Sequence, residues 1–178
     1  LERWTDAVGC YEKADLLEAN DVWTLKRKAL YYRKLERWDE AADCYRAILK
    51  LKDDDVATML NLANYYLYKS DFSQARSILY KVEYLKPNNY KAMSGLAWTL
   101  FVEGDYDKAM TYYDKLSQHK DFTADDALNA GHTFWALGAK EIAREYYRKA
   151  KSLINNDVVF AEKMICVGVV AVAPVTSA

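Results

Sequence analysis

The sequence predicts an all-α solenoid, built from pairs of antiparallel helices that repeat every 34 residues. An alanine recurs at this period along most of the chain, with large residues at fixed positions on either side. A second column of small residues recurs with the same period. The 178 residues include only two prolines and six glycines, too few for a β protein with many tight turns. Each repeat is therefore expected to be a helix, a short turn and a second helix.

The alanine column defines the second helix of each repeat. Its members are Ala7, Ala41, Ala75, Ala109 and Ala143. The residues three positions earlier are Trp4, Trp38, Phe72, Tyr106 and Lys140, the last of which breaks the aromatic run. The residues four positions later are Tyr11, Tyr45, Leu79, Tyr113 and Tyr147. This spacing places all three columns on one face of an α-helix, which is the face expected in the core.

The second column of small residues defines the first helix of each repeat. Its members are Ala29, Ala63, Ala97 and Gly131, and the residues three positions later are Tyr32, Tyr66, Leu100 and Phe134. Small residues allow two helices to approach closely, and large ones fill the space beside the contact. Gly104 and Gly138 fall between the paired helices, and stretches rich in Asp, Asn or Pro fall at the ends of the repeats.

This register predicts one domain over residues 1–166. It consists of a half unit, four full units and the start of a further helix, namely 1–21, 22–55, 56–89, 90–123, 124–157 and 158–166. The sequence begins at Leu1 rather than at a methionine, so we expect a piece of a longer protein. Helices at cut ends expose apolar surface, because a solenoid unit buries its core only against its neighbours.

The stretch from Met164 to Ala178 is uncharged and rich in valine, and it is too short to span a membrane. One interpretation is that the tail, residues 167–178, is disordered or foreign to the natural protein. The other is that it packs into a groove of this chain or of a neighbour.

The copy from Val56 to Asn89 resembles the tetratricopeptide repeat. The residues that carry the resemblance are Leu62, Ala63, Tyr66, Phe72, Ala75, Leu79 and Pro87. The resemblance covers about residues 1–165, with local departures at Lys28 and Lys140. It implies a right-handed superhelical solenoid and a scaffold or adaptor that binds proteins. The first helices would line a concave face, which is the usual binding surface of such solenoids.

The outward faces of the first helices supply the predicted peptide-binding groove. Its candidate residues are Trp23, Lys26, Arg27, Leu30, Arg33, Lys34, Asn61, Asn64, Tyr68, Lys91, Trp98, Phe101, Asn129, His132 and Trp135. The basic residues between 26 and 37 either form a solvated helix face or attract an acidic peptide. The asparagines are either ordinary surface amides or donors to an extended ligand. The aromatic residues form an apolar patch or pack inside the solenoid.

Some tetratricopeptide-repeat proteins bind the acidic C-termini of chaperones through a carboxylate clamp. Lys26, Asn61 and Lys91 occupy positions that resemble the clamp, whereas Leu30 and Gly95 stand where an amide and an arginine are expected. The missing donors argue against a clamp of this kind, because charge-assisted hydrogen bonds dominate carboxylate recognition.

We expect neither an enzyme nor a cofactor. The glycines are dispersed, and His119 and His132 lie in no metal-ligand spacing with cysteine or a carboxylate. Cys10, Cys44 and Cys166 form no CxxC pair and are expected to be reduced, in agreement with a cytoplasmic location.

Three functions remain in competition. The first is a protein- or peptide-binding scaffold, with a partner that is acidic where it faces Lys26 to Lys34. The second is self-association through the end helices and tail. The third is RNA binding through residues 26–37, which the net charge of −1 does not favour.

Overall fold

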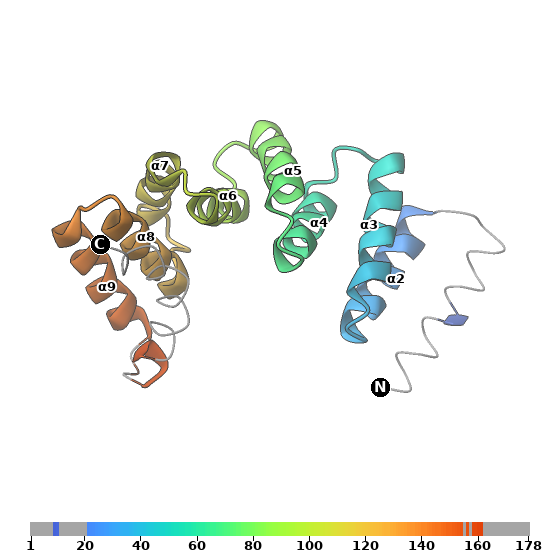
Figure 1. Ribbon diagram of the computed structural model, residues 1–178. Helices are drawn as coiled ribbons and strands as arrows, with labels where there is room; N and C mark the ends of the chain where they lie inside the picture. The colour runs from blue at the N-terminus through green and yellow to red at the C-terminus, as the bar shows by residue number, and fades with distance from the viewer. Residues whose placement is uncertain (1–8, 11–20, 155, 157, 162–178) are drawn as a thin grey trace. The chain divides into compact units, whose positions relative to one another are not determined.

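The computed structural model describes residues 9–10, 21–154, 156 and 158–161. No β-strand occurs among them, which confirms the all-α prediction. Figure 1 shows the helices that follow residue 20 as successive pairs joined by short turns. Their bounds are α2 (Val22–Lys34), α3 (Trp38–Leu51), α4 (Val56–Tyr68), α5 (Phe72–Leu85), α6 (Tyr90–Val102), α7 (Tyr106–Ser117), α8 (Ala124–Ala136) and α9 (Lys140–Ile154).

The chain divides into two compact units, residues 1–89 and 90–178. In unit 1, α2 packs on α3, α3 on α4, and α4 on α5. In unit 2, α6 packs on α7, α7 on α8, and α8 on α9, and α6 also reaches α8. The boundary between the units coincides with a predicted repeat boundary. The single domain over residues 1–166 stays a prediction.

The first helix of each repeat begins at the predicted position, at Val22, Val56, Tyr90 and Ala124. Asp21 and Asp55 cap two of them by accepting hydrogen bonds from the backbone N–H groups of Thr24 and Thr58. Thr123 and Asp126 form a reciprocal capping box at the start of α8. Such caps satisfy N–H groups that have no partner inside the helix, so they fix where each helix starts.

The turn inside each repeat has one residue in the left-handed backbone region. Glu36 and Ser70 have φ values of 59° and 58° in unit 1, and Gly104 and Gly138 have values of 83° and 78° in unit 2. These positions are 34 residues apart, so one turn geometry is used four times. Only glycine adopts this conformation without a steric penalty. Unit 1 therefore bears a conformational cost at two turns that unit 2 avoids.

The described members of both small-residue columns are buried, as predicted. The core of unit 1 includes Leu25, Ala29, Tyr32, Ala41, Tyr45, Ile48 and Leu62. That of unit 2 includes Met93, Ala97, Leu100, Phe101, Ala109, Tyr113 and Leu116. In both units the alanines bring the paired helices close, and the larger side chains fill the adjacent space.

A buried carboxylate ties the first helix of one repeat to the start of the next first helix in each unit. In unit 1, Asp55 forms an ion pair with Lys26 of α2. In unit 2, the carboxylate of Asp126 accepts hydrogen bonds from the hydroxyl groups of Tyr90 and Ser94. The same junction is thus ionic in unit 1 and built from neutral donors in unit 2.

The predictions for the two ends fall mostly outside the described residues. This applies to the half unit 1–21, apart from Gly9, Cys10 and Asp21, and to the tail 167–178. Residues 158–161 are helical, at the start of the further helix predicted over 158–166.

Candidate functional site

A pocket of about 240 Å³ opens between α2, α3 and α4 of unit 1. Four residues from the predicted groove line it, and four further residues come from positions predicted for the core or not singled out. The lining residues are Arg33, Trp38, Ala41, Tyr45, Asn61, Asn64, Tyr65 and Tyr68. All belong to the same compact unit, so the helices of unit 1 alone shape the whole pocket.

Aromatic rings form most of the pocket wall. The ring centroids of Trp38 and Tyr68 lie 6.0 Å apart, in contact distance for aromatic pairs. Tyr68 is 69% exposed and Trp38 is 38% exposed, whereas Ala41 and Tyr45 are buried at the α3 side. The pocket thus has a buried base and a rim of large aromatic side chains that face solvent.

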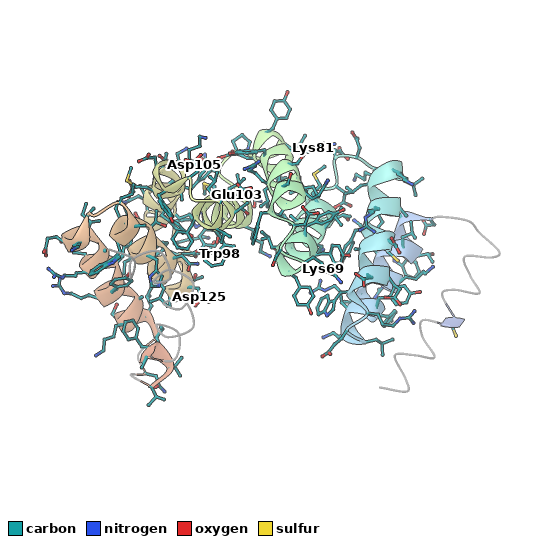
Figure 2. The ribbon with its side chains drawn as sticks, in the orientation of Figure 1. Lys69, Lys81, Trp98, Glu103, Asp105 and Asp125 are labelled. Carbon is teal, nitrogen blue, oxygen red and sulfur yellow. The ribbon has the colours of Figure 1, made fainter. Side chains whose placement is uncertain are left out.

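Tyr65 is held in place by charged neighbours. Its hydroxyl group donates to Asp39 over 2.7 Å, and Asp39 pairs with Lys69 at 2.9 Å. Lys69, labelled in Figure 2, directly follows the last residue of α4. The hydrogen bond from Tyr65, followed by that from Lys69, lowers the pKa of Asp39. The Asp39 charge is therefore balanced within this pair of helices and is not directed at a ligand.

Arg33 supplies the cation of the pocket. Its Nη1 atom donates to Oδ1 of Asn61 over 3.4 Å, a long hydrogen bond to a neutral acceptor. Burial raises the pKa of Tyr45, and the neighbouring Arg33 guanidinium opposes that rise. Arg33 forms no ion pair with any described residue, so no carboxylate in the described part of the chain neutralises its charge. Because a guanidinium has five N–H donors, most of its capacity stays open to a ligand.

The remaining predicted residues of α2 are one lysine that pairs with another helix and four side chains on the outward face. Lys26, which we predicted for the groove, is exposed, and its ammonium group forms an ion pair with Asp55 at the start of α4. Arg27 lies over the ring of Trp23 at 5.2 Å, and Trp23 is 57% exposed. Leu30 and Lys34 are exposed on the same helix. The outward face of α2 therefore combines apolar and basic side chains, as its sequence predicts.

In unit 2 the structure differs from the prediction at two of the groove residues. Phe101 and His132 are buried, each 6% exposed. Phe101 packs on Trp98 and Tyr106, with ring centroids 5.7 Å away in both cases. His132 lies against Tyr147 of α9, and their side chains share a hydrogen bond of 2.9 Å. Both side chains belong to the interior of unit 2.

Burial lowers the pKa of His132, which favours the neutral ring inside the protein. Trp98, labelled on α6 in Figure 2, is half-buried, and so is Asn129. Lys91 and Trp135 are exposed, and the ammonium group of Lys140 lies 5.5 Å from the Trp135 ring. Unit 2 therefore keeps only part of the predicted groove at its surface.

Sequence reasoning missed four residues of the pocket. Trp38, Ala41 and Tyr45 lie in the columns assigned to the core, and Tyr65 was not singled out. The available signal was the run from Tyr65 to Tyr68, which places three tyrosines within four residues at the end of a first helix. One helix face cannot bury all of them, so at least one had to reach the surface.

Among residues 9–10, 21–154, 156 and 158–161, no group of His, Cys, Asp and Glu side chains has an arrangement suited to a metal ion. The same residues include no helix with the length and apolarity needed to cross a bilayer. Cys10 is exposed and Cys44 is buried, and neither forms a disulfide with a described residue.

Three family models, each described as "Tetratricopeptide repeat", match the chain. They cover residues 26–81, 66–129 and 127–157. Together they span the described helices from α2 to α9 almost completely. A search of the curated proteins finds no match to the sequence.

Several solved structures have a similar fold. "Crystal structure of YrrB: a TPR protein with an unusual peptide-binding site" is 20% identical, with a TM-score of 0.77, and the match covers 91% of this chain and 84% of YrrB. MamA is 19% identical, with a TM-score of 0.76 and coverage of 85% and 89%. The thermophilic protein TTC0263 from Thermus thermophilus is 19% identical, with a TM-score of 0.64 and coverage of 93% and 90%. These similarities concern the fold.

Proposed function

Because the chain belongs to the tetratricopeptide-repeat family, we propose that it is a non-catalytic protein-interaction module that binds a peptide segment of a partner across α2 and α4. A protein-interaction scaffold is the function that the family and the fold support in general terms. The site on unit 1 is the specific part of the proposal.

The pocket beside α2 and α4 is the observation that carries this proposal. Arg33, Asn61, Asn64 and Tyr68 were predicted for a binding face from helix geometry, and all four line the pocket. Tyr68 exposes most of its side chain beside the Trp38 ring. Tyrosine, tryptophan and arginine are the residue types that contribute most to binding energy at protein interfaces.

The two asparagines extend the pocket into a surface suited to main-chain contacts. Asn61 and Asn64 lie one turn apart on α4, and their amides carry both donors and acceptors. An extended peptide presents unpaired N–H and C=O groups that such amides can satisfy. YrrB, whose fold is similar, is a tetratricopeptide-repeat protein with an unusual peptide-binding site, which adds support.

The other hypotheses have less support. Self-association was predicted through the end helices and tail, most of which lie outside the described residues. No observation on the described helices favours RNA over protein. The cytoplasmic location stays a prediction.

Selection of random displayed peptides against the whole chain tests the proposal. We expect peptides with a shared sequence pattern, whose binding is lost in a Tyr68→Ala, Asn64→Ala double variant. Tyr84→Ala is the matched control, because Tyr84 is a more exposed tyrosine, on α5 of the same unit. Failure to select any sequence-specific peptide, or equal loss of binding in the control, would count against the site.

A further inference from the structure

Unit 2 fills the place of the unit 1 pocket with one of its own side chains. Two repeats along the chain, Phe101 takes the position of Arg33, and Tyr106 takes that of Trp38. The Phe101 ring is buried, 5.7 Å from the ring of Tyr106. It lies in one cluster with Ala109 and Tyr113. These two residues correspond to Ala41 and Tyr45, which line the pocket in unit 1.

We infer that the unit 1 pocket takes an aromatic side chain from an extended segment of a partner protein, and that acidic residues flank this side chain. This inference rests on the proposed function and names the class of peptide. Unit 2 supplies the precedent, because an aromatic ring occupies the corresponding place there. In unit 1 the same ring has to come from outside, since the position belongs to Arg33.

The size of the pocket fits this occupant. Engineered protein cavities of roughly 150 Å³ bind a benzene molecule. The pocket of about 240 Å³ is larger, so a phenyl, phenol or indole group can enter it. Trp38 and Tyr68 offer their rings at the rim, where an inserted aromatic group gains offset or edge contacts beyond simple burial. A small aliphatic side chain would leave much of the volume empty.

The charges around the pocket determine the flanking residues. The guanidinium of Arg33 is bonded to neutral Asn61 and is paired with no described carboxylate. Lys34, the next residue, is exposed and makes no ion pair with a described residue. A ligand carboxylate beside the inserted ring would therefore gain a charge-assisted hydrogen bond that unit 1 leaves unmade.

The cations continue along the helix, which favours several acidic side chains over a single terminal carboxylate. α2 carries five basic residues and no acidic one, and α4 carries no charge at all. Of the five, Lys26 is already paired with Asp55. Arg27 and Lys34 are both exposed, and they lie about two turns apart on α2. An extended acidic segment can meet both, whereas a C-terminal carboxylate meets only one.

Three synthetic peptides test the inference against the chain of 178 residues. The first has a central phenylalanine between two aspartates, with the terminal groups blocked. The second replaces the aspartates with asparagines, and the third replaces the phenylalanine with alanine. Fluorescence anisotropy gives the three affinities and their dependence on salt. We expect each change to weaken binding about tenfold or more, as the loss of one charged hydrogen bond or one buried ring does.

Variants of the protein show which residues determine the affinity for each peptide. Arg33→Gln should weaken binding of the first peptide about tenfold and leave binding of the second unchanged. Arg148→Gln, which removes the same charge from an exposed position of unit 2, is the control and should leave both affinities unchanged. Arg33→Phe should copy unit 2 by filling the pocket, so the folded variant should bind none of the peptides. Helical circular dichroism confirms that each variant folds.

Several results would overturn the inference. One is equal binding of the aspartate and asparagine peptides, and another is full affinity in Arg33→Phe. Tighter binding of a single-stranded RNA than of the acidic peptide at the same face would also overturn it. If the selected peptides bind through Tyr68 but carry basic or aliphatic residues, the proposed function survives and only the peptide class is wrong. If no peptide binds at all, both proposals fail.

Discussion

Units 1 and 2 use the same backbone pattern for different purposes. In unit 1, Arg33 lines an open pocket. In unit 2, the corresponding residue is Phe101, and its ring is buried. Tyr68 projects from the end of α4, whereas the corresponding residue of α8 is Ala136. The comparison shows that a repeat can keep its helices and turns while a few substitutions open a pocket where the other unit has core. The following predictions test this difference, from the largest expected effect to the smallest.

Removing the internal ring should affect unit 2 far more than removing the corresponding cation affects unit 1. Phe101→Ala should lower the free energy of unfolding by about 3–5 kcal/mol, because it leaves a cavity beside Tyr106. Arg33→Ala should change it by less than about 0.5 kcal/mol, since Arg33 is exposed. Urea unfolding measures both. A cost below about 1 kcal/mol for Phe101→Ala would show that the ring is not core.

The two junctions should respond to opposite extremes of pH. Burial raises the pKa of Asp55, but hydrogen bonds from Lys26 and from the Thr58 N–H outweigh it, so the net pKa lies below 3.8. A carboxyl group with a lowered pKa stabilises the fold above its unfolded pKa, and this stability is lost as the pH falls through the folded pKa. Unit 1 should therefore lose the contribution of this junction below about pH 3.8.

In unit 2, burial and the hydrogen bond to Asp126 raise the pKa of Tyr90 from 10.0 to about 12. A tyrosine with a raised pKa contributes stability that is complete below its unfolded pKa, so this stability should fall between about pH 10 and 12. Burial also raises the pKa of Tyr147 in unit 2 to about 12.

Fluorine NMR of the protein labelled with fluorotryptophan can follow the unfolding of each unit at acid and at alkaline pH. Trp38 reports on unit 1 and Trp135 reports on unit 2. Tyr90→Phe should remove part of the alkaline effect and leave the acid effect unchanged. If the folded signals of Trp38 and Trp135 disappeared together at both acid and alkaline pH, the two units would not have separate pH-sensitive junctions.

Adding a methyl group at Gly131, in the last full repeat, should lower the stability of the protein. Gly131 takes the place that alanine has in the first three full repeats. A Cβ atom built on it would lie closer to Cε1 of Tyr147 than two such atoms can approach. Gly131→Ala should therefore cost about 1–3 kcal/mol, despite the better helix propensity of alanine. Thermal unfolding measures the change, and a stabilised variant would show that the Tyr147 ring moves aside easily.

Substitutions in the turns inside the repeats should change the free energy of unfolding least. Ser70→Gly in unit 1 should stabilise the protein by up to about 1 kcal/mol, because the native φ of 58° is unfavourable for serine. Gly104→Ala in unit 2 should destabilise it by about 1–2 kcal/mol, since the native φ there is 83°. The midpoints of denaturant unfolding give both values. Changes of the same sign would contradict the shared turn geometry.

The sequence predicted the fold in detail because helix starts and buried columns are local and periodic. It also placed Arg33, Asn61 and Tyr68 on one outward surface, since helical spacing determines which side chains share a face, and all three line the pocket. The same reasoning placed Phe101 and His132 in a groove, although both are buried. Spacing alone cannot tell whether a face is covered, because that depends on the size of side chains on a neighbouring helix.

Trp38 illustrates the opposite error. It shares a column with Phe72 and Tyr106, so the pattern assigned it to the core, yet 38% of it is exposed. The difference comes from a residue on another helix, because Arg33 leaves open the space that a phenylalanine fills in unit 2. Comparing equivalent positions between repeats, rather than along one helix, would have revealed this exchange.

The most direct test of the account is a two-dimensional NMR titration of the labelled chain of 178 residues with the peptide that carries phenylalanine between aspartates. The predicted result is a shift of the Trp38 indole N–H and of the Asn61 and Asn64 side-chain amides. The Asn129 amide, which corresponds to Asn61, and the Trp135 indole N–H should not shift. Shifts centred on unit 2, or spread evenly over both units, would contradict the conclusion that unit 1 holds the open site.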